Sequence, residues 1–155
     1  MPVTENEVPI WKGSPSQAIN IPSYIACAIV AAAVLYFLGP FGLALLLAPA
    51  GFAVKKCLEV ESVQYELTNQ RLRIRSGILN KKTQDMELYR VKDYASIQPL
   101  ALRAFGLSDI LLESSDKSTP HVVLHAVKDA EALIDIIREN VEALRQRKGI
   151  REFNF

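Results

Sequence analysis

The chain has no charged side chain between Ile19 and Val54, and Lys55 and Lys56 end this run of 36 residues. A membrane-spanning helix needs about 20 consecutive apolar residues, so a run of this length is typical of membrane segments. As one α-helix it would rise about 54 Å, against roughly 30 Å of hydrocarbon core. The central Gly-Pro-Phe-Gly sequence at residues 39–42 is of a kind that interrupts helices. The run therefore predicts a helical hairpin, with one span near residues 19–38 and a second from residue 41 into residues 54–58.

A cleaved signal peptide is the alternative interpretation of this N-terminal run, with the alanines at residues 31–33 as a cleavage region. We favour retained spans, because the segment before the run is net negative and apolar residues continue for about twenty positions past those alanines. The second predicted span is shorter than the first. Its uncharged part covers residues 41–54 and contains Pro49, so we expect it to extend through Leu58, to tilt, or to be re-entrant.

Two crossings would place both chain ends on one side of a membrane. Lys55 and Lys56 beside the second span favour the cytoplasmic side, because positive residues are enriched in cytoplasmic flanks. Trp11 precedes the first span, and aromatic rings are common at membrane interfaces. We therefore take Trp11, Lys55 and Lys56 as candidate membrane-interface anchors.

The sequence contains few residue patterns that are typical of catalytic or metal-binding sites. The two cysteines, Cys27 and Cys57, lie in different environments and have no metal-ligand spacing. His121 and His125 would stand about 13 Å apart on a strand, too far to bind one metal ion together. The glycines are scattered, and no nucleophile motif is present. With a net charge of +1, the composition also gives no reason to expect nucleic acid. We expect no enzyme, no cofactor, no bound metal and no nucleic-acid partner.

After Lys56 the pattern changes to the alternation of β-strands. Strands are predicted over residues 63–67, 71–75 and 84–91, and further ones over residues 94–98, 109–113 and 121–126. From Asp129, a possible N-cap, the spacing changes to that of an amphipathic helix that ends before Gly149. Its apolar positions are Ala130, Leu133, Ile134, Ile137, Val141 and Leu144. The sequence thus predicts an N-terminal segment (1–18), a transmembrane helical hairpin (19–58) and an α+β domain (59–155).

Three stretches of the soluble part carry a family resemblance. They read Tyr65-x-Leu67-Thr68-Asn69-x-Arg71-Leu72-x-Ile74-x-x-Gly77-Ile78-Leu79, Glu87-Leu88-x-Arg90-Val91-x-Asp93, and Arg103-x-Phe105-Gly106-Leu107-x-Asp109-Ile110. Together with the hairpin before them, they resemble the bacterial pleckstrin-homology domain family, in its membrane-anchored branch. The resemblance covers nearly the whole chain.

This resemblance implies a small antiparallel β-barrel or sheet capped by a C-terminal helix. It also implies a multi-pass protein of the bacterial inner membrane whose soluble domain is cytoplasmic. The expected function is that of a scaffold or assembly module that self-associates or binds other membrane proteins through its sheet edges. Lipid-headgroup binding does not follow from the fold alone.

A row of basic residues is the strongest candidate surface. Arg71, Arg73 and Arg75 share one face of their strand, and Lys81 and Lys82 follow in the next loop. Beside an anionic membrane each such cation contributes about 1 kcal/mol. The row has three interpretations: a solvated face with cross-strand ion pairs to Asp85 or Glu87, a surface that orients the domain on the membrane, or a specific site for an anionic lipid headgroup or partner.

Overall fold

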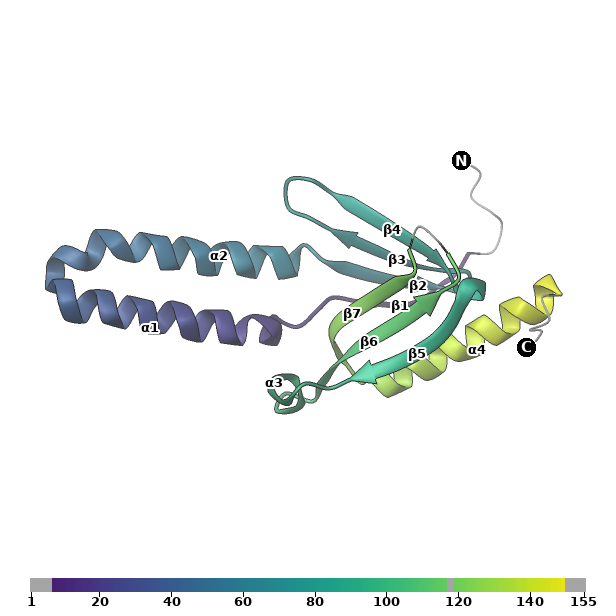
Figure 1. Cartoon of the computed structure of the whole chain (residues 1–155). Coiled ribbons are helices and arrows are strands. Elements are labelled where there is room, and N and C mark those ends of the chain that lie inside the picture. The colour runs from purple at the N-terminus through teal and green to yellow at the C-terminus, as the bar shows by residue number, and fades with distance from the viewer. Residues whose placement is uncertain (1–6, 117–118, 150–155) are drawn as a thin grey trace.

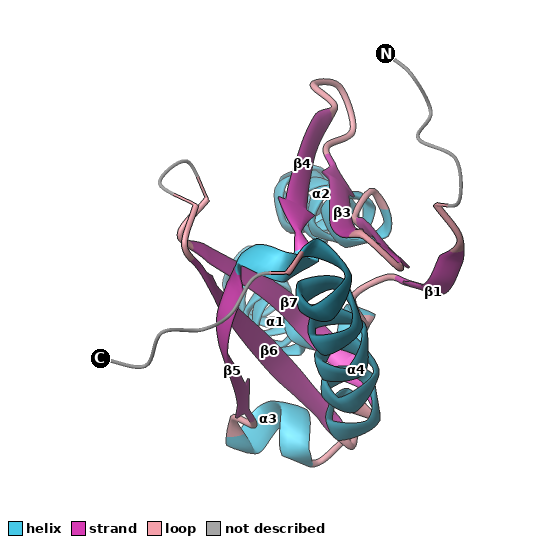
Figure 2. Ribbon diagram, turned by 90° about the vertical axis from the view of Figure 1, so that its right-hand side faces the viewer, coloured by secondary structure: helices cyan, strands magenta, loops and turns pink. Residues whose placement is uncertain are grey.

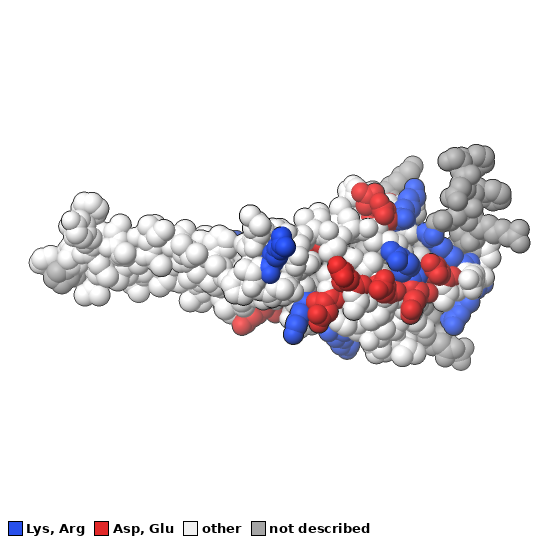
Figure 3. Space-filling view, turned by 90° about the horizontal axis from the view of Figure 1, so that it is seen from below, with Lys and Arg blue, Asp and Glu red and all other residues white. Residues whose placement is uncertain are grey.

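The computed structural model describes residues 7–116 and 119–149. The outer ends of the predicted N-terminal segment and C-terminal domain, and two residues of the 114–120 loop, lie outside this description. Two long helices project from one end of a unit made of two β-sheets and a C-terminal helix (Figure 1). On the face drawn in Figure 3, charged side chains lie over the sheets and the base of the hairpin, and the outer part of the hairpin shows none.

The hairpin consists of two helical arms. A 3-10 turn, η1 (Gln17–Asn20), leads into α1 (Ile21–Leu38), and a 3-10 segment, η2 (Gly39–Leu46), leads into α2 (Leu47–Glu61). The arms Gln17–Leu38 and Phe41–Glu61 are both long and apolar enough to cross a membrane. Pro49 does not interrupt the second arm, because it lies in the first turn of α2, where the missing N–H has no intrahelical partner.

The 3-10 segment also lengthens the short second span. A 3-10 helix rises about 2.0 Å per residue and an α-helix about 1.5 Å. Residues 41–54 therefore extend over about 24 Å rather than the roughly 21 Å of a purely α-helical stretch. Lys55 and Lys56 can add reach by extending their aliphatic stems toward the interface.

The strands form two antiparallel sheets. The first has the order β1 (Pro9–Gly13), β2 (Gln64–Thr68), β3 (Arg71–Ser76) and β4 (Lys82–Glu87). The second contains β5 (Val91–Ile97), β6 (Leu107–Ser114) and β7 (His121–Lys128). Within the residues described, no strand pairing joins the two sheets, so the closed-barrel form of the expectation does not occur.

The chain leaves the first sheet sooner than the alternation predicted. The expected strand over residues 84–91 ends at Glu87, and a 3-10 turn, η3 (Leu88–Arg90), redirects the chain into β5. Leu88, the first residue of this turn, and Val91, directly after it, are both fully buried. A straight strand cannot direct positions 88 and 91 to the same side, because side chains alternate along it. The turn resolves this and starts the second sheet.

The hairpin is an insertion between two neighbouring strands. β1 lies before α1 in the sequence, yet it pairs with β2, which follows α2, with Trp11 opposite Leu67 and Gly13 opposite Tyr65. The first sheet is therefore built from both sides of the hairpin, and the predicted N-terminal segment (1–18) contributes the strand β1 to it. Both connections between hairpin and sheet are short.

The C-terminal helix α4 (Ala130–Lys148) lies across the side of the sheets that faces away from the hairpin (Figures 1 and 2). Its buried residues are the six of the predicted apolar stripe. They join a core centred on the fully buried Leu67, Leu72, Ile110 and Leu124. Asp129 occupies the N-cap position in a left-handed conformation without a capping side-chain hydrogen bond, and Gly149 ends the helix at φ 66°.

Candidate functional site

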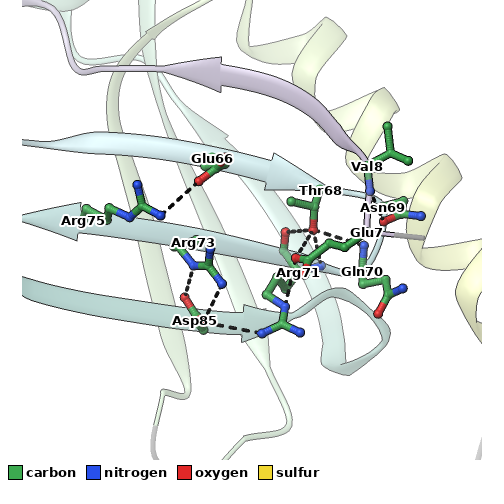
Figure 4. A network of polar contacts seen from close by, with 10 residues as sticks. All are labelled: Glu7, Val8, Glu66, Thr68, Asn69, Gln70, Arg71, Arg73, Arg75 and Asp85. Atoms are coloured by element: carbon green, nitrogen blue, oxygen red, sulfur yellow. Dashed lines mark hydrogen bonds and ion pairs between the residues drawn. The ribbon is translucent and has the colours of Figure 1, made fainter. Parts of the chain in front are cut away.

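The basic row lies on the first sheet in a lattice of opposite charges (Figure 4). Arg73 forms a bidentate pair with Asp85 of β4, with Nε 2.9 Å from Oδ1 and Nη2 3.2 Å from Oδ2. Arg71 lies 3.6 Å from the same carboxylate, and Arg75 lies 3.4 Å from Glu66 of β2. Hydrogen bonding to Asp85 raises the pKa of Arg73. These contacts are those of the cross-strand ion-pair interpretation, at least for the three arginines.

Two further partners come from the N-terminal side of the hairpin. Glu7 contacts Arg71 at 3.1 Å and the hydroxyl of Thr68 at 3.0 Å (Figure 4). Lys12 of β1 lies 3.1 Å from Glu66. The hydrogen bond from Lys12 lowers the pKa of Glu66, and the charge of Arg75 acts in the same direction. The face is therefore of mixed charge, and its formation depends on the pairing of β1 with β2.

The two lysines of the candidate surface differ from the arginines. Lys81 and Lys82 are exposed at the turn between β3 and β4 and form no ion pair with any residue in 7–116 or 119–149. The structure thus divides the predicted basic surface into three arginines with acidic partners and two lysines, at the β3–β4 turn, that have no acidic partner among the described residues.

A cluster of polar side chains holds the two arms together at their ends nearest the sheets. We call this cluster the clasp, and it consists of Gln17, Asn20 and Tyr24. The side-chain amide of Asn20 donates to the carbonyl of Lys56 at 2.8 Å, and the amide of Gln17 donates to the carbonyl of Cys57 at 3.0 Å. The hydroxyl of Tyr24 donates to the Gln17 side chain at 3.1 Å. Asn20 is only 6% exposed. Buried side-chain amides need such partners, so the clasp fixes how the arms meet.

Sequence reasoning missed this clasp, although a signal was present. Gln17, Asn20 and Tyr24 are spaced three and four residues apart, which places them on one face of a helix. A polar stripe at the start of an apolar span indicates a contact other than lipid. The carbonyls that accept the hydrogen bonds leave no such signal, because any residue of α2 could supply them.

A groove of about 550 Å³ opens beside the clasp. Its lining includes Asn20, Lys56 and Glu59 from the hairpin and Tyr65, His121 and His125 from the two sheets. The hydroxyl of Tyr65 accepts the backbone N–H of His125 at 3.0 Å, which links β2 to β7. Burial raises the pKa of Tyr65, so this phenol stays protonated at neutral pH. The groove has both polar and apolar walls and lies between the hairpin and the sheets.

Among the residues described, no cluster of three or more His, Cys, Asp or Glu side chains could hold a metal ion.

The three candidate interface anchors occupy different places. Lys55 and Lys56 lie in α2 and pair with Glu59 at 3.7 and 3.3 Å, on the sheet side of the apolar run. Trp11 is part of β1, and its partly buried ring packs against the core of the sheets. Core packing accounts for the position of Trp11 without a membrane.

The family comparison covers most of this arrangement, but not the residues before the first arm. A family model described as a bacterial PH (pleckstrin-homology) domain matches residues 17–141, from the start of the first arm into α4. The chain belongs to the bacterial PH domain family. Comparison with curated proteins and with solved structures gave no match.

The extent of the match confirms the resemblance found in the sequence. Both apolar arms lie inside the matched residues, as expected for a membrane-anchored branch of the bacterial PH domains. The match begins at Gln17, so β1 lies outside it, and only the strand pairing reveals that β1 completes the first sheet. Domains of this family are in general non-catalytic modules for lipid or protein interactions.

Proposed function

We propose that this bacterial PH domain is a scaffold or assembly module of the bacterial inner membrane. Both arms cross the bilayer, and the sheets and α4 lie on the cytoplasmic side. The module binds a second copy of itself or another membrane protein. The observation that carries this proposal is the insertion of the hairpin between β1 and β2, reinforced by the clasp at Asn20.

This insertion gives the domain a defined orientation. A domain on a single flexible linker can present any face to its surroundings, whereas two short connections and a buried clasp limit it to one pose above the arms. Its exposed strand edges and the groove at the junction then stay at a constant height. A fixed pose reduces the ordering cost of binding a partner in the same membrane.

Crosslinking in native membranes tests the proposal. A photoreactive residue replacing Thr83, on the outer edge of β4, is expected to yield a defined crosslink to a protein, either a second copy or a distinct band identified by mass spectrometry. A photoreactive residue at Phe41, at the tip of the hairpin, serves as the matched control. Crosslinks from position 83 to lipid alone would contradict a protein-binding role.

Self-association has its own measurement. Native mass spectrometry in mild detergent and in nanodiscs is expected to show species larger than the monomer. Monomer alone in both media would remove the homo-oligomer and leave a different membrane protein as the partner.

The second candidate is an anionic-lipid sensor that uses Arg71, Arg73, Arg75, Lys81 and Lys82. Lys81 and Lys82 favour it, since neither forms an ion pair within the described residues, while the ion pairs of the three arginines weaken it. Reversal of charge at all five positions separates the two candidates. For a sensor, the enrichment of anionic lipid around the protein in mixed nanodiscs would be lost, and for a scaffold the protein crosslink from position 83 would persist.

A further inference from the structure

The turn between β3 and β4 exposes apolar side chains. Leu79 is 95% exposed and Ile78 is 47% exposed. Gly77 adopts φ 107°, and a Cβ there would overlap the carbonyl of Asn80, so the turn is tightly formed rather than loose. The N–H of Gly77 donates to the hydroxyl of Ser62 at the end of α2. The turn is thereby fastened to the base of the second arm.

A second apolar projection lies between β5 and β6. The short helix α3 (Leu100–Arg103) carries Leu100, which is 83% exposed, and Phe105, which is 55% exposed, follows it. Its buried Leu102 belongs to a small cluster against which Ala18 and Ile19 pack. This projection is thereby fastened to the base of the first arm.

The two apolar projections extend in the same direction, toward the arms. Both are the parts of the sheet unit that extend furthest toward the arms (Figure 1). Viewed along the arms, the β3–β4 turn and α3 lie on opposite sides of the hairpin (Figure 2). A single exposed leucine is common on protein surfaces, but here two exposed apolar tips flank a membrane anchor on opposite sides.

Their height relative to the bilayer follows from the second arm. Glu61 ends α2 five residues after Lys56, a rise of about 7.5 Å. Lysines at the end of a span extend their ammonium groups outward, so their Cα atoms lie deeper than the charge. The end of α2 then falls in the headgroup layer, which is about 5–7 Å thick on each side. The β3–β4 turn is bonded to Ser62 at that level.

We propose that the tips at Ile78–Leu79 and at Leu100–Phe105 enter the interfacial layer of the bilayer on either side of the hairpin. The protein then contacts the membrane at three places, which are the hairpin and the two tips. Lys81 and Lys82, beside the first tip, and Arg103, in the second, lie where lipid phosphates are found. Apolar burial supplies the contact, and these cations add to it when the lipid is anionic. The proposal depends on the hairpin crossing the membrane and not on any protein partner.

Lipid quenching of a fluorophore tests this on the full chain in nanodiscs. Cys27 and Cys57 are replaced by alanine, and an environment-sensitive probe is attached at Leu79→Cys or Phe105→Cys. Glu139→Cys on the exposed face of α4 is the matched control, and Phe37→Cys in the first arm reports insertion of the hairpin. With phosphatidylcholine carrying a headgroup-depth quencher, we expect at least twofold stronger quenching at positions 79 and 105 than at 139.

Three results would overturn the proposal. Quenching at positions 79 and 105 equal to that at 139, with position 37 shielded from an aqueous quencher, would show a crossed hairpin whose tips stay in water. Quenching that requires phosphatidylglycerol would show that the cations act without apolar contact. Exposure of position 37 to the aqueous quencher would overturn both this inference and the proposed membrane function.

Discussion

At the scale of single residues, Asn20 is a buried polar link between the two arms. Its buried amide donates to the carbonyl of Lys56 in the opposite arm. Asn20→Leu keeps the branched shape and the number of side-chain heavy atoms but removes the donor, so we expect the free energy of unfolding in mild detergent to fall by about 1–2 kcal/mol. Asn140→Leu is the matched control, because that amide donates to the carbonyl of Ile136 within its own helix. Equal losses in thermal or denaturant unfolding of the two variants would contradict a special role for the clasp.

Glu66 predicts a dependence on pH. The hydrogen bond from Lys12 is the main cause of its lowered pKa, below the ordinary value of 4.5. A carboxylate with a lowered pKa contributes stability above that ordinary value, and the contribution is lost as the pH falls through the folded-state pKa. The stability difference between the native chain and Glu66→Gln should therefore be present at neutral pH and vanish in acid.

The Glu66 effect will be small, under about 1 kcal/mol, because the pairs lie near the surface. Thermal unfolding of both proteins across this range measures it. A difference that grows in acid would contradict the assigned contacts.

At the scale of elements, β1 contains a glycine that leaves no room for a side chain. The indole of Trp11 lies over Gly13, and a Cβ at residue 13 would overlap the ring. Gly13→Ala should displace the indole from the core and lower the free energy of unfolding by about 1–3 kcal/mol. Ser14→Ala, at the exposed neighbouring position, should change it by less than about 0.5 kcal/mol. Equal stability of the two variants in denaturant unfolding would show that the ring moves aside freely.

Elements differ in how well the sequence alone predicted them. The stripe of α4 was predicted residue by residue, because an amphipathic helix carries its burial pattern within its own period. β1 was not, because residues 9–13 are short, begin with proline, and pair with a strand that follows the whole hairpin. Local patterns contain no information about such distant pairing.

The same limit of local patterns decides which contacts of the candidate site could be predicted. Asp85 could be named as a partner of the basic row because it lies on the strand that follows, in a predictable β-hairpin. Glu7 and Glu66 could not, since their places depend on β1 and on the far side of β2. The open form of the two sheets depends on the turn at residues 88–90, where burial of Leu88 and Val91 overrides the alternation.

At the scale of the whole molecule, the hairpin and the domain act as one unit. The arms emerge from the first sheet between neighbouring strands, the clasp joins them, and α4 covers the opposite side (Figure 1). If both arms cross a bilayer, the tip of the hairpin and α4 must lie on opposite faces of it. The proposed scaffold role and the interfacial contacts both depend on this arrangement.

Labelling with a membrane-impermeant maleimide tests it most directly. In a chain whose native cysteines are replaced by alanine, Phe41→Cys at the hairpin tip should react in intact spheroplasts. Glu139→Cys on α4 should react only after permeabilisation. Reaction of both positions in intact spheroplasts, of neither position until permeabilisation, or of position 139 alone would contradict a hairpin that crosses the membrane with its sheets on the cytoplasmic side.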